Sequence, residues 1–156
     1  PRSVGQIPLY YNAKKTGRPM NPDDHFTSKY LDITNDPLYP FGYGLSYTTF
    51  SYGDLQLDKT SVQGENGVLT ASVQVTNTGK LEGEEVVQLY IGDPAASISR
   101  PMKELKNFQK ISLKPGESRK VSFTITPEDF WEPGLFNIYV GTNSRDVKSA
   151  QVTWNK

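Results

Sequence analysis

Short runs that alternate apolar and polar residues fill the chain from about residue 54 onward, and this two-residue period constrains the fold more than any other feature. In the run GVLTASVQVTNTG, Leu69, Val73 and Val75 fall on one side of an extended chain, because successive strand side chains point to opposite faces. Turn residues separate the runs at intervals of about 8 to 12 residues, a spacing typical of a β-sandwich. The period predicts seven strands, near residues 55–57, 69–75, 87–91, 103–113, 121–125, 136–140 and 150–154.

Residues 54–156 are therefore expected to form an all-β domain, an immunoglobulin- or fibronectin type III-like β-sandwich of two antiparallel sheets. Pro115-Gly116 and Pro133-Gly134 predict type II turns between strands, because Pro fixes φ and Gly accepts the positive φ that follows. In KELKNFQKISL the alternation slips between Phe108 and Ile111, so we expect a β-bulge or a bend there.

Residues 1–53, called the arm below, lack this regularity and are rich in Gly, Pro, Asn and Asp. A structureless segment of this length is uncommon in a compact protein, and we expect the arm to be extended and to pack along another domain. Its last part, YPFGYGLSYTTF (Tyr39–Phe50), holds five aromatic rings and two glycines in twelve residues. Such rings bury large areas against a neighbour, although they could also stack on the apolar face of a sugar.

Arg100, in the segment SISRPMKEL, lies beside Pro101 and near Glu104. A long arginine in a loop more often joins two domains by an ion pair than it grips a ligand. Trp131 and Trp154 are expected to pack rather than to form a binding platform. The residues expected to make the interdomain contact are Tyr39, Phe41, Tyr43, Leu45, Tyr47, Phe50, Arg100 and Glu104.

Charge and cysteine content exclude several classes of partner and chemistry. The 156 residues carry 17 basic and 17 acidic side chains, so no electrostatic attraction to nucleic acid or to an anionic membrane is expected. The sequence holds no apolar run of the roughly 20 residues that span a bilayer, and no signal peptide. Cysteine is absent, which excludes disulfides and leaves the redox compartment undecided. Because the chain begins PRSVGQIP without Met, we expect a processed or excised piece of a longer protein.

The sequence offers no constellation of residues that would make this chain an enzyme by itself. The one histidine, His25, stands beside Asp23 and Asp24, and adjacent residues seldom supply the three or four converging ligands that a metal needs. We therefore predict no metal site, no cofactor and no catalytic residue in this chain, and leave the substrate-binding residues unknown. The carboxylates that could form a glycosidase pair fall in turns or on predicted solvent faces: Glu82, Glu84, Glu85, Glu128 and Asp129.

The ordered series of motifs along the chain resembles one enzyme family. PRSVGQIPLYYN, TGRPMNP, PLYPFGYGLSYTTF, VTNTGKLEGEEVVQLYIGDPAASISRPMKELKNFQKISLKPGESRKVSF and EPGLFNIYVGTNSRD together are similar to the C-terminal end of a glycoside hydrolase family 3 enzyme of the periplasmic β-glucosidase type. The resemblance covers nearly the whole chain in the right order.

This resemblance implies both an organisation and a role. Residues 1–12 would end the α/β-sandwich domain of the family, and YPFGYGLSYTTF would be the linker between that domain and a fibronectin type III-like domain at 54–156. The catalytic aspartate and glutamate of the family would lie upstream, so this chain would be an inactive module that packs on and stabilises the catalytic domains of a retaining β-glucosidase. No cofactor is implied, and the compartment would be the periplasm or the exterior. A carbohydrate-binding module for glucan and a dimerisation or adhesion module remain the alternatives.

One segment departs from the family pattern. Around Phe130–Glu132 the family usually carries a longer hairpin before the EPG turn, whereas TPEDFWEPG compresses it to almost nothing. Either the sequence has a true deletion at this point or a mobile loop is missing from it, and the contacts that such a loop would make in the whole enzyme are left open.

Overall fold

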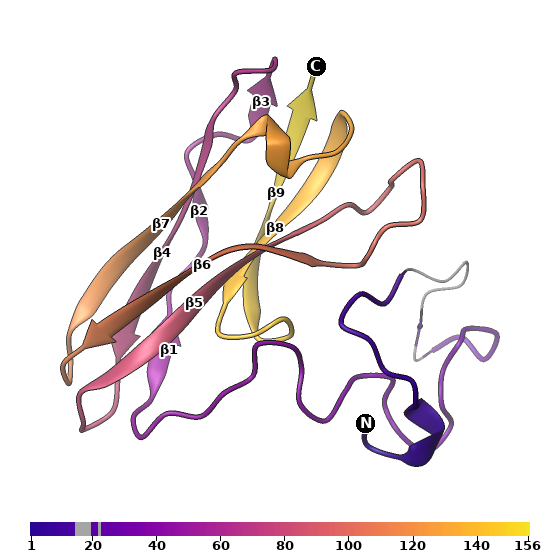
Figure 1. Cartoon of the computed structure of the whole chain (residues 1–156), viewed down its shortest axis with the longest axis horizontal. Coiled ribbons are helices and arrows are strands. Elements are labelled where there is room, and N and C mark those ends of the chain that lie inside the picture. The colour runs from indigo at the N-terminus through magenta and orange to yellow at the C-terminus, as the bar shows by residue number, and fades with distance from the viewer. Residues whose placement is uncertain (15–19, 22) are drawn as a thin grey trace.

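Two β-sheets face each other (Figure 1), and buried apolar side chains fill the layer between them. The computed structural model describes residues 1–14, 20–21 and 23–156, so most of the TGRPMNP motif lies outside the described residues. Two single-turn 3₁₀ helices, η1 (Val4–Gln6) and η2 (Pro127–Asp129), accompany the strands. The strands of the described residues are β1 (Phe50–Tyr52), β2 (Gln56–Leu57), β3 (Ser61–Gln63), β4 (Leu69–Asn77), β5 (Gly83–Gly92), β6 (Glu104–Leu113), β7 (Ser118–Ile125), β8 (Gly134–Gly141) and β9 (Val147–Asn155).

The first sheet is built around β4, which pairs with β7 along one edge and with β1 and β2. The second sheet has the order β3-β9-β8-β5-β6. All of these pairings are antiparallel except that of β3 with β9, which is parallel and sets Val62 opposite Trp154. The predicted all-β, fibronectin type III-like sandwich is confirmed, with the three-residue strands β1 and β3 added to the predicted strands. Because β1 pairs with β4, the last residues of the arm already belong to the first sheet.

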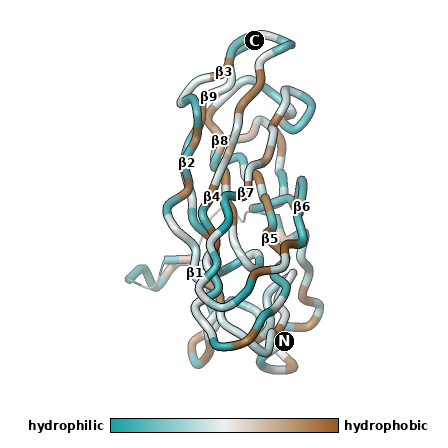
Figure 2. The backbone as a smooth tube through the Cα atoms, turned by 90° about the vertical axis from the view of Figure 1, so that its left-hand side faces the viewer, coloured by the Kyte–Doolittle hydropathy of each residue, from teal (hydrophilic) through white to brown (hydrophobic). Residues whose placement is uncertain are grey.

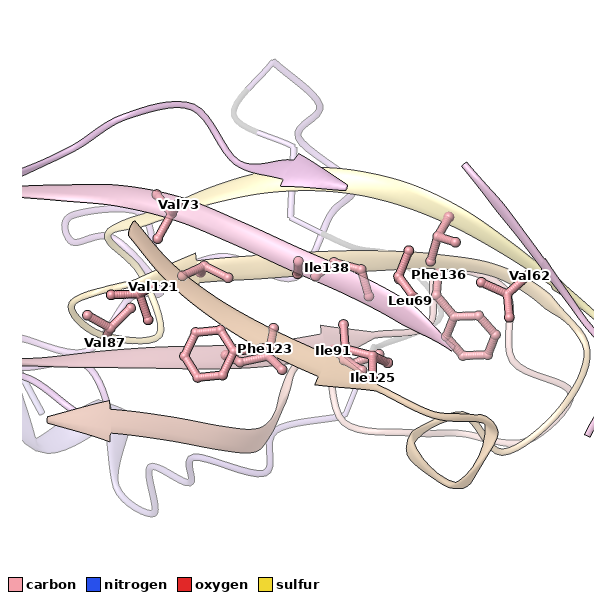
Figure 3. Close-up of a cluster of buried hydrophobic side chains, with 14 of the residues drawn as sticks. Val62, Leu69, Val73, Val87, Ile91, Val121, Phe123, Ile125, Phe136 and Ile138 are labelled. Atoms are coloured by element: carbon pink, nitrogen blue, oxygen red, sulfur yellow. The ribbon is translucent and has the colours of Figure 1, made fainter. Parts of the chain in front are cut away.

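The core lies between the two sheets and is made by the apolar residues of the predicted period. Figure 2 shows hydrophobic and hydrophilic positions alternating along the strands, as side chains of opposite parity enter the core or face outward. In Figure 3, Leu69 and Phe123 of the first sheet approach Ile91, Phe136 and Ile138 of the second. All five of these side chains are buried. The sandwich is thus stabilised by one continuous apolar cluster that draws on both sheets.

Two local predictions are corrected and one is confirmed by the backbone. Gly116 has φ = 76°, as the Pro115-Gly116 type II turn requires, but Gly134 has no positive φ because it is the first residue of β8 and pairs with Trp154. The predicted irregularity between Phe108 and Ile111 is wrong, since β6 pairs regularly with β5 there. The register shift lies instead at Lys106, between the pairs Leu89–Asn107 and Tyr90–Leu105.

The departure of Phe108 from the apolar pattern has a simple cause. This side chain points to the outer face of its sheet and is 61% exposed, while Ile111 points into the core. An exposed aromatic residue, and not a shift in register, therefore breaks the alternation at this point.

Replacing Phe136 with Ala tests the core. Phe136 is fully buried and its ring lies 4.6 Å from the ring of Phe130, so its removal leaves a cavity. We expect the free energy of unfolding, measured by urea titration, to fall by about 3–5 kcal/mol. Leu135→Ala, at the neighbouring half-exposed position, is the matched control and should change it by less than about 1 kcal/mol. Similar losses for both variants would contradict this assignment of the core.

Candidate docking surface

The arm covers part of the outer face of the five-stranded sheet. Gln88 and Tyr90 point away from the core, because Val87, Leu89 and Ile91 point into it, yet both are buried. The side-chain amide of Gln88 donates to the carbonyl oxygen of Gly42 at 3.1 Å and to that of Thr142 at 2.7 Å. The hydroxyl of Tyr90 donates to the amide oxygen of Gln88. A polar pair on the sheet thereby holds the backbone of the arm.

Two aromatic residues of the arm lie beside this contact. The rings of Tyr11 and Phe41 are stacked with their centroids 4.0 Å apart. The hydroxyl oxygen of Tyr11 accepts a hydrogen bond from the backbone N–H of Leu105, and the carbonyl oxygen of Phe41 accepts one from Ser144 at 2.9 Å. Segments of the arm thirty residues apart in sequence thus meet over the same part of the sheet.

Gly42 permits this close approach for two reasons. Its φ of 78° lies in the left-handed region that favours glycine. A Cβ at this position would also overlap the side-chain amide of Gln88. The second glycine of the GYG motif, Gly44, has neither property: its surroundings are open and its φ is not positive.

A second anchor holds the arm at Thr48. The fully buried Asn77 donates from its side-chain nitrogen to the carbonyl oxygens of Leu81 at 2.8 Å and Leu113 at 2.9 Å. Its side-chain oxygen accepts from the hydroxyl of Thr48 at 2.7 Å and from the backbone N–H of Gly79 at 3.0 Å. All polar capacity of this buried amide is used, so the segment between Gly42 and Thr48 is tied to the sandwich at both ends.

Between and beside these anchors, large apolar side chains face outward. Leu45 is 88% and Tyr47 is 97% exposed, and the rings of Tyr39 and Tyr43 lie 5.1 Å apart on the surface. Phe108 belongs to the same region, because it is the cross-strand neighbour of Gln88, which binds Gly42. We call the set Tyr39, Tyr43, Leu45, Tyr47 and Phe108 the aromatic face.

The residues predicted to make an interdomain contact thus divide into groups. Phe41 stacks on Tyr11 and binds Ser144 in the loop between β8 and β9, and Phe50 packs against the core. Glu104 forms an ion pair with Lys106 at 3.3 Å, and Arg100 lies over the ring of Trp131. The remaining four, Tyr39, Tyr43, Leu45 and Tyr47, belong to the aromatic face. Sequence reasoning missed Gln88, Tyr90 and Asn77, because a polar residue in a strand is ordinarily read as solvent-facing.

Few side chains of the described residues are arranged for metal binding or catalysis. They contain no group of three or more His, Cys, Asp or Glu residues that could hold a metal ion. Among the carboxylates considered for catalysis, Glu85 accepts a hydrogen bond from the hydroxyl of Tyr52 at 2.7 Å, and Asp129 caps the backbone at Thr126. The part of the chain that the structure describes also contains no helix that is long and apolar enough to cross a membrane.

This architecture is similar to that of a known domain family and of known enzymes. The Fn3-like family, described as a fibronectin type III-like domain, matches residues 85–144, from β5 to the loop after β8. The periplasmic β-glucosidase of Salmonella typhimurium is 54% identical over 95% of this chain and 21% of that protein. A β-xylosidase of Formosa agariphila is 44% identical over 98% of this chain and 22% of its own length. The chain belongs to glycoside hydrolase family 3.

The structural comparison extends over the arm as well as the sandwich. The family 3 chain superposes on the crystal structure of a β-glucosidase from Listeria innocua in complex with isofagomine with a TM-score of 0.89. The two are 41% identical over 100% of this chain and 23% of the other. The chain therefore spans about a fifth of the length of the family 3 relatives that it matches.

Gly42→Ala tests the first anchor of the arm. Because the left-handed backbone at this position is strained for a residue with a Cβ, and because the new Cβ overlaps Gln88, we expect a loss of about 1–3 kcal/mol in the free energy of unfolding. Amide hydrogen exchange at Ser144, whose N–H donates to Phe41, should become faster. Gly44→Ala, in open surroundings, is the matched control. Unchanged exchange at Ser144 in the Gly42 variant would show that this contact does not hold the arm.

Tyrosine titration tests the burial of the rings beneath and beside the arm. Burial raises the pKa of Tyr11, Tyr90 and Tyr139, and burial together with the charge of Glu85 raises the pKa of Tyr52. Above pH of about 10 the unfolded chain loses these phenolic protons while the native chain keeps them, so the free energy of unfolding should fall as the pH rises further. Absorbance at alkaline pH should show these four rings ionising at a higher pH in the native chain than in the unfolded chain. Their ionisation at an ordinary pKa in the native chain would contradict this burial.

Proposed function

We propose that this chain is a non-catalytic module of a family 3 β-glucosidase, and that its aromatic face docks on the catalytic part of the enzyme and stabilises it. One observation carries the proposal: Leu45 and Tyr47 are almost fully exposed on a segment that is anchored on both sides. Large apolar side chains held out in this way are typical of a surface that a partner covers.

The energetics favour docking over a purely solvated surface. The hydrogen bonds at Gly42 and Thr48 order the backbone of this segment before any partner arrives. Burying Leu45 or Tyr47 would then contribute about 1.5–3 kcal/mol each, with less entropy lost than in a flexible segment. Such a contribution can stabilise the catalytic part as well as hold the module on it.

The length of the relatives indicates the partner. Since this chain corresponds to about a fifth of each relative, the remaining part of the same enzyme is available to cover the aromatic face. The whole enzyme would hydrolyse terminal β-D-glucosyl residues with retention, an activity suggested by the two β-glucosidases rather than by the β-xylosidase. The name of the Salmonella relative supports a periplasmic or secreted location for the whole enzyme.

The carbohydrate-binding alternative receives less support from the geometry. A pyranose stacks on a flat aromatic surface, whereas the rings of Tyr39 and Tyr43 are tilted by 41° to each other. Trp131, which could supply such a surface, is approached by the cations of Arg100 and Lys106. Glucan binding and self-association are therefore treated as outcomes of the experiment that follows.

Reconstitution of the enzyme from two pieces tests the proposal. The isolated chain should not hydrolyse a chromogenic aryl β-glucoside, and activity should appear when it is mixed with the remaining part of the enzyme. The double variant Leu45→Ser/Tyr47→Ser should weaken this association at least tenfold, because it removes two of the apolar side chains from the contact. Val68→Ser, a half-exposed apolar position just before β4, is the matched control and should leave the association unchanged.

Besides a failure of the two pieces to associate, three results would contradict the docking role. The first is association that the double variant leaves intact. The second is a chain that binds soluble glucan through Tyr43 or Tyr47 in the absence of the catalytic part. The third is a mass in sedimentation that rises with concentration and falls in the double variant, which would indicate that the aromatic face joins two copies of this chain.

A further inference from the structure

Arg100 occupies an unusual position in the loop between β5 and β6. Its guanidinium carbon lies 4.2 Å from the centre of the Trp131 ring, and the Lys106 ammonium lies 4.8 Å from the same centre. Stacking on an indole fixes the plane of a guanidinium and leaves its N–H groups directed outward in that plane. The side chain of Arg100 is therefore held in one orientation by a contact that uses none of its hydrogen-bond donors.

One of these donors is buried without an acceptor. The Nε of Arg100 is inaccessible to solvent and has no hydrogen-bond partner among the residues that the structure describes. A buried donor on a cation destabilises a protein by more than its hydrogen bond would stabilise it, so such a group normally has a partner. The two terminal nitrogens of the same guanidinium are not among the buried atoms and donate to no described residue, so an acceptor from outside can reach them. Beside a cation the strongest acceptor is a carboxylate.

The neighbouring carboxylates are already engaged. Glu132 accepts hydrogen bonds from the backbone N–H and the hydroxyl of Ser97, Glu104 pairs with Lys106, and Asp93 accepts from the indole N–H of Trp131 at 3.0 Å. The two hydrogen bonds from Ser97 are the main cause of the lowered pKa of Glu132. The positive charge of Arg100 makes a smaller contribution. The local anions thus orient the loop and the indole and leave the donors of Arg100 to another group.

The arm brings this loop to the side on which a partner is expected. The backbone N–H of Met102 donates to the carbonyl oxygen of Ala13 at 3.2 Å, and Lys14 forms an isolated β-bridge with Pro101. Figure 1 shows the loop between β5 and β6 projecting from the sandwich above the N-terminal segment. A partner that covers the arm would therefore also reach Arg100.

We propose that Arg100, stacked on Trp131, is a binding site for a carboxylate, and that its occupant is an aspartate or glutamate side chain of the remaining part of the enzyme. This inference rests on the proposed docking function and names the chemistry of one of its contacts. The guanidinium would donate to the carboxylate through its two terminal nitrogens, since the buried Nε is closed to a group from outside. The contact would set the register of docking, while the aromatic face supplies the buried area.

The salt dependence of association tests this site. The dissociation constant between this chain and the remaining part of the enzyme is measured at 50 and 500 mM NaCl. Arg100→Gln should weaken association about tenfold or more at low salt and should flatten its dependence on salt, and Arg100→Lys should recover only part of the loss because it lacks the fork of donors. Arg119→Gln, on the other sheet and paired with Glu117, is the matched control and should match the wild type. Wild-type affinity in Arg100→Gln would overturn the inference and leave the docking function standing.

A second measurement keeps the site testable if the two pieces do not associate, a result that would contradict the docking function itself. Sodium acetate is added to the isotope-labelled chain, with sodium chloride at equal ionic strength as the control, and the Nε–H signals of the arginines are followed by NMR. We expect acetate to shift the Arg100 signal and to leave that of Arg119 in place. No shift at Arg100, or equal shifts at both arginines, would overturn the inference.

Discussion

The second half of strand β5, residues 87–92, is buried on both of its faces, and the rest of the structure depends on this double burial. Its inward side chains, Val87, Leu89 and Ile91, belong to the apolar layer between the sheets, and its outward side chains, Gln88 and Tyr90, lie beneath the arm. The strand also pairs with β6 and β8 along its two edges. The arm is therefore part of the same packed unit as the sandwich, because the burial of Gln88 and Tyr90 requires it.

The sequence predicted the sandwich well because a two-residue period is a local property. Strands β4, β7, β8 and β9 follow from the alternation of Val, Ile, Leu and Phe with polar residues, and each contributes its apolar face to the core. Local patterns could not show where tertiary contacts change the environment of a side chain. Gln88 reads as a solvent-facing residue until Gly42 lies against it, and Phe108 reads as a core residue although it points outward. Pro133-Gly134 failed as a turn signal because strand pairing of Gly134 took precedence over the preference of the dipeptide.

The same limit applies to the candidate docking surface. Composition identified the aromatic segment but could not divide it into residues that pack on the sandwich and residues that face outward. That division follows from the two anchors: the carbonyl oxygen of Gly42 and the hydroxyl of Thr48 are bonded to the sandwich, and the large side chains between them are exposed. Arg100 illustrates the point in another way, because only the three-dimensional arrangement shows that its nearest carboxylates already have other partners.

The register shift at Lys106 has a consequence for how this module can meet other proteins. β6 is the last strand of its sheet, and a flat outer strand with unpaired backbone groups would accept a strand of a second chain. The shift interrupts the regular ladder, and Lys106 and Lys110 place charges along this strand, the latter paired with Glu84 at 2.6 Å. Both features oppose backbone-mediated strand addition, which is a common route to aggregation. Recognition at this edge of the module is thereby left to side chains, so that a partner binds there through complementary shape and charge.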